Sequence, residues 1–530
     1  MNDAVIKKRD LDVLFRPRSV AVMGASSDEK KIGGRPIFYL KHYNYAGDIY
    51  PINPNYDEVQ GVKAYKSLAD VPGDVDLALI ALPSAMVEDA VTTCAKKGVK
   101  ATVIFSSGFA ETGSEGEAAQ ARLLEIAGAS GMRIMGPNCM GLAGFGSRMI
   151  MTFGFSMEIK PPELGPIGIV SQSGAYGAVA YYEARDRELG VSLWATTGNE
   201  SDIGLAEILE YYANDDEIKV MLLYMEGCKD GAGFMRGLEA ARVAGKPVIV
   251  TKVGASDIGA EAALSHTASI TGSDVVFDTV VAKYGAHRAM SMDEFYDLGY
   301  ACSVTRSFPT GNRVGLLTVS GGVGVLMSDI ASRHGLEVPK LSDAAQARIR
   351  EIIPYAGTRN PVDITAQALN QPDILESCMD VLIEEDVCDI IVLYMAMATQ
   401  SPALADKFMQ LFQNIRAKHP DVPIVAGVYA EGERRKEMED LGYIVIREPT
   451  RAVSVAASLL RFGRSFAAPA PQIPAKLPNP VVVPPQILNE LEAKSLLASA
   501  GIPTVQETLA TSASAAASAV AGLSGPAALK

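Results

Sequence analysis

The sequence has little cysteine, few aromatic residues and no long apolar run. The shortage of cysteine and the lack of long apolar runs each exclude a class of protein. The six cysteines among 530 residues form no CxxC pair, which disfavours both a disulfide framework and a cysteine-based metal site. No stretch reaches the roughly 18 apolar residues of a membrane-spanning helix, and the N-terminus has no apolar signal core. These features predict a cytoplasmic protein that does not associate with membranes.

An excess of positive charge is also missing. The formal net charge is −14 at pH 7, so no global field favours nucleic acid or an anionic membrane surface. An anionic ligand would have to be held by local lysines, arginines and backbone N–H groups. Glycine is plentiful, with 48 residues, and hydrophobic residues make up 48% of the chain, which suits tightly packed α/β layers.

Short apolar runs alternate with helical stretches along most of the chain. Runs such as RSVAVMGAS, VDLALIALP and ATVIFSSGF each end in glycine, proline or serine, and this alternation predicts doubly wound parallel sheets. We expect a Rossmann-like domain over 1–150 and two flavodoxin-like domains over 160–305 and 310–465, because each of the latter opens with an apolar strand followed by Ser-Gly. A Pro-rich linker over 466–486 and a short segment over 487–530, too small to fold alone, complete the expected organisation.

Three strand-to-helix junctions are rich in small residues. The first, MGASSDEKKIGGRP (23–36), lacks the GxGxxG pattern of a dinucleotide site, but a loop in this position offers free N–H groups to a phosphate. The turns SQSGAYG (171–177) and SGGVGV (320–325) place Ser and Gly where a helix begins, with its unpaired N–H donors. Glycine in either turn could serve chain geometry alone. Two such helix N-termini facing each other could instead hold one phosphoryl group.

His266 is the candidate nucleophile among five histidines. It lies between small residues in AALSHTASITGSD (262–274), whereas His334 and His419 stand where helices are expected to end. Taken alone, a loop histidine is more often a solvated side chain than a catalyst. A carboxylate that accepts its Nδ1–H would raise its nucleophilicity, and Glu226 at the strand end LLYMEG is placed for that role.

The motifs, taken in order, resemble those of the NDP-forming (ADP-forming) acyl-CoA synthetases, relatives of succinyl-CoA synthetase. The resemblance spans nearly the whole chain, through GASSDEKKIGG, YPINPNY, GPNCMG, GIVSQSGA, TTGNESD, YMEG, SHTASITGSD, SGGVGVL and RNPVDIT. It implies a ligase that joins a carboxylic acid to coenzyme A (CoA) with ATP and releases ADP and phosphate, through a phosphohistidine and an acyl phosphate. Short-chain or aromatic acids of the hydroxycinnamate type are the implied substrates. The resemblance does not choose the acid or the oligomeric state, for which a homodimer is one arrangement.

The resemblance also implies a role for individual residues. His266 would be phosphorylated and Glu226 would support it. Residues 487–530 resemble the start of an ATP-grasp domain, whose body would hold ATP and Mg²⁺, so we expect no metal site in the 530 residues and no transfer from ATP by these 530 residues alone. The other implied positions are Gly24, Ser26, Arg35, Pro54 and Lys63 for CoA; Ser171, Gln172, Ser173, Gly174, Ser320, Gly321, Gly322 and Gly324 for phosphate; Asn138, Cys139, Asn199 and Glu200 for the acyl group; and Lys530 for ATP.

Two other interpretations compete with a ligase. A non-catalytic acyl-CoA-binding scaffold of the protein acetyltransferase type would keep these domains, but such proteins often lose the histidine that this chain retains. A Rossmann oxidoreductase would carry GxGxxG and a ribose-binding acid after the second strand, and neither is clear in the sequence.

Overall fold

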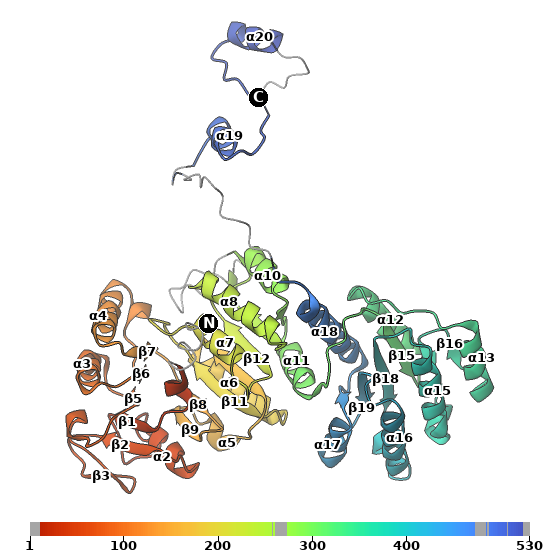
Figure 1. Cartoon of the computed structure of the whole chain (residues 1–530), viewed down its shortest axis with the longest axis horizontal. Coiled ribbons are helices and arrows are strands. Elements are labelled where there is room, and N and C mark those ends of the chain that lie inside the picture. Colours follow the sequence, from red (N-terminus) through yellow and green to blue (C-terminus); the bar gives the residue numbers. More distant parts are fainter. Residues whose placement is uncertain are drawn as a thin grey trace. The chain divides into compact units, whose positions relative to one another are not determined.

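The computed structural model describes residues 11–256, 258–259, 273–471, 484, 487–505 and 507–522. Residues 1–469 and 470–530 form two compact units. The first unit contains three sheets in which parallel strands alternate with helices (Figure 1). The predicted α/β class with a CoA-binding domain and two flavodoxin-like domains is therefore confirmed.

The first sheet is parallel throughout, in the order β2-β1-β5-β6-β7. Its strands are apolar because helices cover both faces: α2 packs on one face, and α3 and α4 pack on the other. The elements are β1 (Ser19–Met23), α2 (Arg35–His42), β2 (Asp48–Ile52), the hairpin β3 (Glu58–Val59) and β4 (Val62–Lys63), β5 (Leu77–Ile80), α3 (Val87–Lys97), β6 (Ala101–Ile104), α4 (Ser114–Ser130) and β7 (Arg133–Met135).

The second sheet has the order β14-β13-β12-β10-β11-β8-β9. Its parallel strands follow the flavodoxin-like order, in which the first strand lies between the second and the third. The elements are β8 (Gly141–Gly144), β9 (Met149–Thr152), α5 (Ser156–Ile159), β10 (Ile167–Ser171), α6 (Gly174–Asp186), β11 (Val191–Thr196), α7 (Leu205–Ala213), β12 (Val220–Met225), α8 (Gly231–Val243), β13 (Val248–Lys252), α10 (Asp274–Lys283), β14 (His287–Arg288) and α11 (Met292–Val304).

The hairpin β8–β9 differs from the predicted domain boundary. The range 1–150 assigned this segment to the first domain, but β8 pairs antiparallel with β11 and so extends the second sheet. An apolar run predicts a strand without indicating which sheet edge it joins. The first sheet therefore ends with β7, before this hairpin begins.

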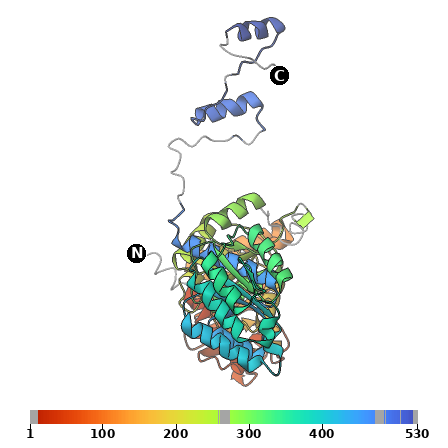
Figure 2. The ribbon, with the colours of Figure 1, turned by 90° about the vertical axis from the view of Figure 1, so that its right-hand side faces the viewer.

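The third sheet repeats the flavodoxin-like order, as β16-β17-β15-β18-β19-β20. Helices α12 and α18 pack on one face, and α13, α15 and α16 pack on the other, which is turned toward the viewer in Figure 2. The elements are β15 (Val314–Thr318), α12 (Gly321–Arg333), α13 (Asp343–Ile352), β16 (Gly357–Thr358), β17 (Val362–Asp363), α14 (Gln367–Asn370), α15 (Asp373–Glu384), β18 (Ile390–Ala396), α16 (Ala405–Lys418), β19 (Ile424–Val428), α17 (Gly432–Asp440), β20 (Tyr443–Val445) and α18 (Pro449–Ala467).

The second unit contains two helices, α19 (Glu490–Ser499) and α20 (Ala513–Ala521). Helix α19 begins with a capping box, in which Asn489 accepts from the Glu492 N–H and Glu492 accepts from the Asn489 N–H. Residues 487–505 and 507–522 contain no strand, and the assignment of this segment to an ATP-grasp domain stays a prediction. Across the residues with described structure, no helix is both long and apolar enough to cross a bilayer.

Arg133 joins the first sheet to the segment that precedes α7. Its guanidinium donates to Asp202 at 2.9 and 3.0 Å and to Glu207 at 2.8 and 3.0 Å. All three side chains are about three-quarters buried. The pairing neutralises two carboxylates at the contact between the first and second domains.

We expect Arg133→Ala to lower the midpoint of thermal unfolding by several degrees, because it leaves two carboxylates that are about three-quarters buried without their donor, at about 1–3 kcal/mol. Circular dichroism melting would measure the shift. Arg122→Ala is the matched control, since it removes a pair with Glu88 in which both side chains are about half exposed, worth about 0–1 kcal/mol. Equal shifts in the two variants would contradict this role for Arg133.

Candidate active site

A cavity of about 300 Å³ lies where β10, β11 and β12 end. Loops from the first and second sheets both line it, and ligands of doubly wound sheets bind at such carboxyl ends. The cavity brings together eight residues that the sequence singled out, namely Asn138, Cys139, Gln172, Ser173, Gly174, Asn199, Glu200 and Glu226. Phe105, Glu111, Met140, Phe153, Ala175, Gly198 and Lys229 complete the lining.

The N-terminus of α6 opens on this cavity. Ser173 is the N-cap, and its hydroxyl accepts from the Tyr176 N–H at 3.3 Å. Ser171 is buried, and its hydroxyl donates to the Ser173 carbonyl at 2.7 Å, which fixes the turn. The first N–H groups of a helix have no intrahelical acceptor and carry partial positive charge. Ser173 and Gly174 therefore present an arrangement suited to phosphoryl oxygens.

Gln172 lies in the same turn, and its predicted phosphate contact stays a prediction; its side chain contacts the turn of Glu226 and Glu200. Its Oε1 accepts from the N–H groups of Glu226 at 2.5 Å and Gly227 at 3.0 Å. Its Nε2 donates to Glu200 Oε2 at 3.0 Å and to the Gly227 carbonyl at 2.8 Å, and its own N–H donates to Tyr224. Gln172 thus ties the turn that carries Glu226 to the start of α6.

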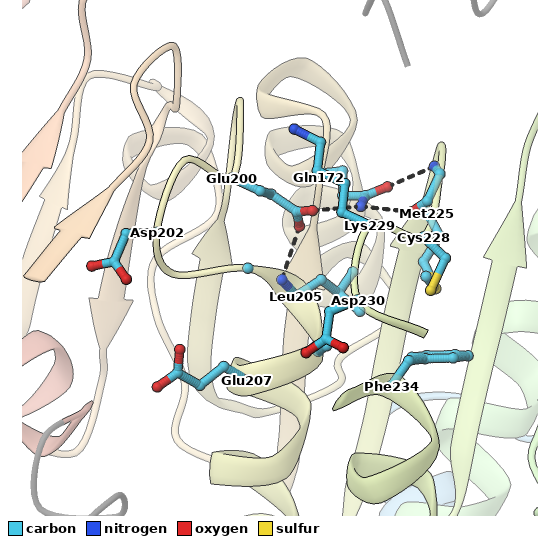
Figure 3. Close-up of a pocket in the computed structure, with 13 residues that line it drawn as sticks. Gln172, Glu200, Asp202, Leu205, Glu207, Met225, Cys228, Lys229, Asp230 and Phe234 are labelled. Carbon is cyan, nitrogen blue, oxygen red and sulfur yellow. Dashed lines mark hydrogen bonds between the residues drawn. The ribbon is translucent and has the colours of Figure 1, made fainter. Parts of the chain in front are cut away.

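Glu200 lines both this cavity and a smaller one of about 120 Å³, whose lining residues Figure 3 shows. Its carboxylate accepts from Thr197 Oγ1 at 2.9 Å, the Leu205 N–H at 2.8 Å and Gln172. Desolvation by burial raises the pKa of Glu200, and these hydrogen bonds offset only part of the effect. The backbone of Glu200 has φ of 50°, a conformation that non-glycine residues rarely adopt and that often marks functional loops.

The predicted acyl-binding residues form a polar network on one side of the cavity. Asn138 Nδ2 donates to Asn199 Oδ1 at 3.3 Å, and Asn199 Nδ2 donates to Glu111 Oε2 at 2.5 Å. Burial opposes ionisation of Glu111, but hydrogen bonds from Asn199 and from the Gly108 and Phe109 N–H groups outweigh it and lower the pKa. Nothing in the local sequence indicates Glu111, because its partner is 88 positions away.

Cys139 is the fourth predicted acyl-site residue. It is almost completely buried, and its Sγ donates to the Ile104 carbonyl at 3.4 Å. Burial raises the pKa of the Cys139 thiol to about 12. The thiol is therefore protonated at neutral pH, and Cys139 contributes to the wall of the cavity rather than acting as a nucleophile.

The predicted CoA residues lie on the segments that follow β1 and β2 in the first sheet, which include the start of α2 and the hairpin β3–β4. Gly24 has φ of 85°, and a Cβ atom there would come within 2.4 Å of the Ala81 carbonyl oxygen, so only glycine fits. The Ser26 hydroxyl accepts from the Asp28 N–H, and Arg35 pairs with Glu158 at 3.1 Å. Pro54 and Lys63 are exposed, the latter on the hairpin β3–β4.

Gln60 is a residue of this loop region that sequence reasoning missed. Its Nε2 donates to the carbonyls of Ser26 at 3.0 Å and Gly34 at 2.9 Å. The amide thereby fixes the two ends of the loop between β1 and α2. No motif points to Gln60, because the contact joins residues that are distant in sequence.

The second Gly-rich turn lies on the third sheet, at the start of α12. Ser320 precedes the helix without a capping hydrogen bond from its side chain. Gly321 and Gly322 form the first residues of the helix, and a Cβ atom at Gly324 would lie 3.2 Å from Pro361 and Thr318 side-chain atoms. None of these residues is among the described lining of the cavity at Ser173. The predicted joint grip on one phosphoryl group therefore stays a prediction.

His266 and Lys530 lie outside the described residues, so their roles rest on the sequence. In the ranges that the structure describes, no group of three or more His, Cys, Asp and Glu side chains is arranged to hold a metal ion.

Two tyrosine rings lie near Glu226, the expected partner of His266. The rings of Tyr176 and Tyr224 stack at 3.7 Å between centroids. Burial and the neighbouring Glu226 charge raise the pKa of Tyr224 to about 12.

Comparison with known proteins identifies the domains. Residues 18–144 match the CoA binding domain, residues 164–302 the succinyl-CoA ligase like flavodoxin domain, and residues 314–456 the ligase-CoA domain.

Similar proteins are found among both sequences and solved structures. The chain is 35% identical over 458 residues to the alpha subunit of ADP-forming acetate–CoA ligase II from Pyrococcus furiosus, covering 85% of this chain and 97% of that subunit. It is 32% identical over 544 residues to a trans-feruloyl-CoA synthase from an unknown prokaryotic organism, covering 100% of this chain and 76% of that protein. The dinucleotide forming acetyl-coenzyme A synthetase 1 of Ca. Korarchaeum cryptofilum, solved with phosphate and ADP, is similar at a TM-score of 0.77 and 30% identity, over 86% of this chain and 97% of that one. The chain therefore belongs to the family of ADP-forming acyl-CoA synthetases.

Proposed function

We propose that this chain carries the acyl-transfer and phosphohistidine steps of an acid–thiol ligase that forms acyl-CoA from a carboxylic acid, CoA and ATP. The observation that carries the proposal is the shared cavity, on which the N-terminus of α6, Glu226 and the amides of Asn138 and Asn199 all open. Such a cavity offers separate places for a phosphoryl group and an acyl group. The competing scaffold would need no phosphate-binding helix beside the acyl site.

The proposed reaction has three steps. The γ-phosphoryl group of ATP moves to a ring nitrogen of His266, so that a P–N bond forms, the P–O bond between the γ-phosphorus and the bridging oxygen breaks, and ADP leaves. A carboxylate oxygen of the acid then attacks phosphorus, the P–N bond breaks, and an acyl phosphate forms. Finally the thiolate of CoA attacks the acyl carbon, the C–O bond breaks, and phosphate leaves. Glu226 would accept the second ring N–H of His266 and raise its nucleophilicity.

The first turn of α6 would act in the phosphoryl-transfer steps. Phosphoryl transfer is catalysed mainly by positioning and by donors that face the equatorial oxygens. Ser173 and Gly174 supply oriented donors of this kind, and Gln172 fixes their position relative to Glu226. ATP and CoA are substrates in this scheme, and Mg²⁺ would enter with ATP.

The acid belongs to the short-chain or aromatic class in this proposal. A volume of about 300 Å³ lies at the lower end of the range of roughly 300–1,000 Å³ that small-molecule sites span. Phe105 and Phe153 line the cavity with their rings edge to face at 4.9 Å, a surface on which an aromatic ring can pack. Among the relatives, the acetate–CoA ligase is named after a short-chain acid and the trans-feruloyl-CoA synthase after an aromatic acid.

The last two steps can be tested in reverse on this chain without ATP. We expect incubation with acyl-CoA and radioactive phosphate to release free CoA thiol and to label the protein with acid-labile, alkali-stable phosphate. A panel of acetyl-CoA, phenylacetyl-CoA and feruloyl-CoA would rank the acids. Binding of acyl-CoA with neither thiol release nor label would overturn the proposal and favour the scaffold.

A further inference from the structure

Lys229 is a cation at the edge of the active-site cavity that no sequence motif singled out. It follows the Glu226–Gly227 turn by two residues, it is exposed, and it lines both the larger and the smaller cavity. Its Nζ donates to the Asn199 carbonyl at 2.6 Å. Figure 3 shows Lys229 beside Gln172 and Glu200 at the rim of the smaller cavity.

The charges around the larger cavity are unbalanced. Among its described lining residues, three are acidic, namely Glu111, Glu226 and Glu200, the last with a pKa raised by burial, and Lys229 is the one cation. Hydrogen bonds outweigh burial and lower the pKa of Glu111, which is therefore ionised at neutral pH. The N-terminus of α6 contributes about half an elementary charge.

The proposed reaction brings further negative charge into this cavity. The acid enters as a carboxylate and leaves its first step as an acyl phosphate, so both bound species are anions. Anions beside several carboxylates are destabilised unless a cation is close, because Coulomb interactions are strong away from bulk water. Lysine supplies a compact charge on a flexible four-carbon stem.

We propose that Lys229 binds the carboxylate of the acid and the acyl phosphate formed from it. The inference rests on the proposed function. In the step concerned, a carboxylate oxygen forms the O–P bond as the P–N bond to His266 breaks, and no proton is transferred. Lys229 neutralises the charge that accumulates on the transferred group, by exchanging its contact with the Asn199 carbonyl for one with the substrate.

A purely structural role would also explain the Asn199 contact, and three substitutions separate the two roles. Lys229→Met removes the charge and the donor but keeps the stem. Lys229→Gln keeps a donor for the Asn199 carbonyl without the charge, and Lys229→Arg keeps the charge. Restoration by glutamine would indicate a structural link, whereas restoration by arginine alone would indicate charge.

Labelling of the intact chain by radioactive acetyl phosphate provides the measurement. We expect Lys229→Met and Lys229→Gln to raise the acetyl phosphate concentration for half-maximal labelling by about 10- to 100-fold, the range for one lost charge-assisted hydrogen bond. Lys229→Arg should recover most of this loss, and the affinity for CoA should not change. Lys219→Met, an exposed lysine of the same domain outside the cavity, should label as the native chain does.

The outcomes separate the two proposals. Absence of label in the native chain, both with acetyl phosphate at any concentration and with phosphate and each acyl-CoA of the panel, would overturn the proposed function. A labelled native chain with an unchanged concentration dependence in Lys229→Met, or recovery by Lys229→Gln, would overturn the role of Lys229 alone. A rise in the acetyl phosphate concentration for half-maximal labelling that is confined to Lys229→Met and Lys229→Gln would support the role of Lys229.

Discussion

Replacement of His266 by asparagine is expected to lower covalent phosphate labelling from acyl-CoA and phosphate by at least about 10³-fold, since nothing else in the scheme accepts the phosphoryl group. Asparagine keeps a polar side chain of similar reach but offers no nucleophilic ring nitrogen. The variant should still convert acyl-CoA and phosphate to acyl phosphate and CoA. When the reaction starts from acyl-CoA, this step comes before the phosphoryl group is transferred to His266. Free thiol would report this conversion, and protein-bound phosphate would report the transfer.

The matched control is His42→Asn, at the exposed end of α2. It should label at the native level, because His42 lies outside the proposed site. Native labelling in His266→Asn would show that another side chain carries the phosphoryl group. Loss of thiol release together with loss of label would mean that the substitution disturbs the acyl site as a whole.

Much of the fold could be predicted from local patterns. Apolar strands that end in glycine or serine and alternate with helices predict parallel sheets, and the central strands of all three sheets are parallel. The hairpin β8–β9 was assigned to the first domain, because its pattern predicts a strand pair without specifying a partner. Its hydrogen bonds to β11 depend on which sheet edge is free in three dimensions.

The part of the site that lies at the ends of strands could be predicted from the sequence. Ser173, Glu226 and Asn199 follow neighbouring strands of one sheet, and parallel strands bring their carboxyl ends together. Glu111 and Lys229 had no local signal, since each joins the site through a contact between distant segments.

The role of Gln172 shows a second limit of sequence reasoning. Its position in the turn suggested a contact with phosphate, and only the structure shows its amide bonded to the Glu226 turn and to Glu200. An amide has both donors and acceptors, so the residue type alone does not indicate which partner it takes. The same limit applies to the turn at Ser320, whose partner in space depends on the packing of whole domains.

Glu226→Gln is expected to slow labelling of His266 by about 10²- to 10⁴-fold, the usual contribution of a positioned acid–base group. The amide occupies the same volume and can still accept a hydrogen bond, so the turn held by Gln172 should keep its shape. What it lacks is the negative charge that stabilises the imidazolium as the ring nitrogen attacks phosphorus. Rates of label incorporation at saturating acetyl phosphate would measure the effect.

Two further variants separate charge from position at Glu226. Glu226→Asp keeps the charge but withdraws it by one methylene. Its rate of labelling should lie between the rates of the native chain and of Glu226→Gln. Glu163→Gln removes an exposed carboxylate of the same domain that pairs with Arg185, and it should label at the native rate. If Glu226→Gln labels as fast as the native chain, the charge of Glu226 does not assist His266. If thiol release from acyl-CoA and phosphate also slows in Glu226→Gln, Glu226 acts in the acyl-transfer step as well, because labelling by acetyl phosphate does not pass through that step.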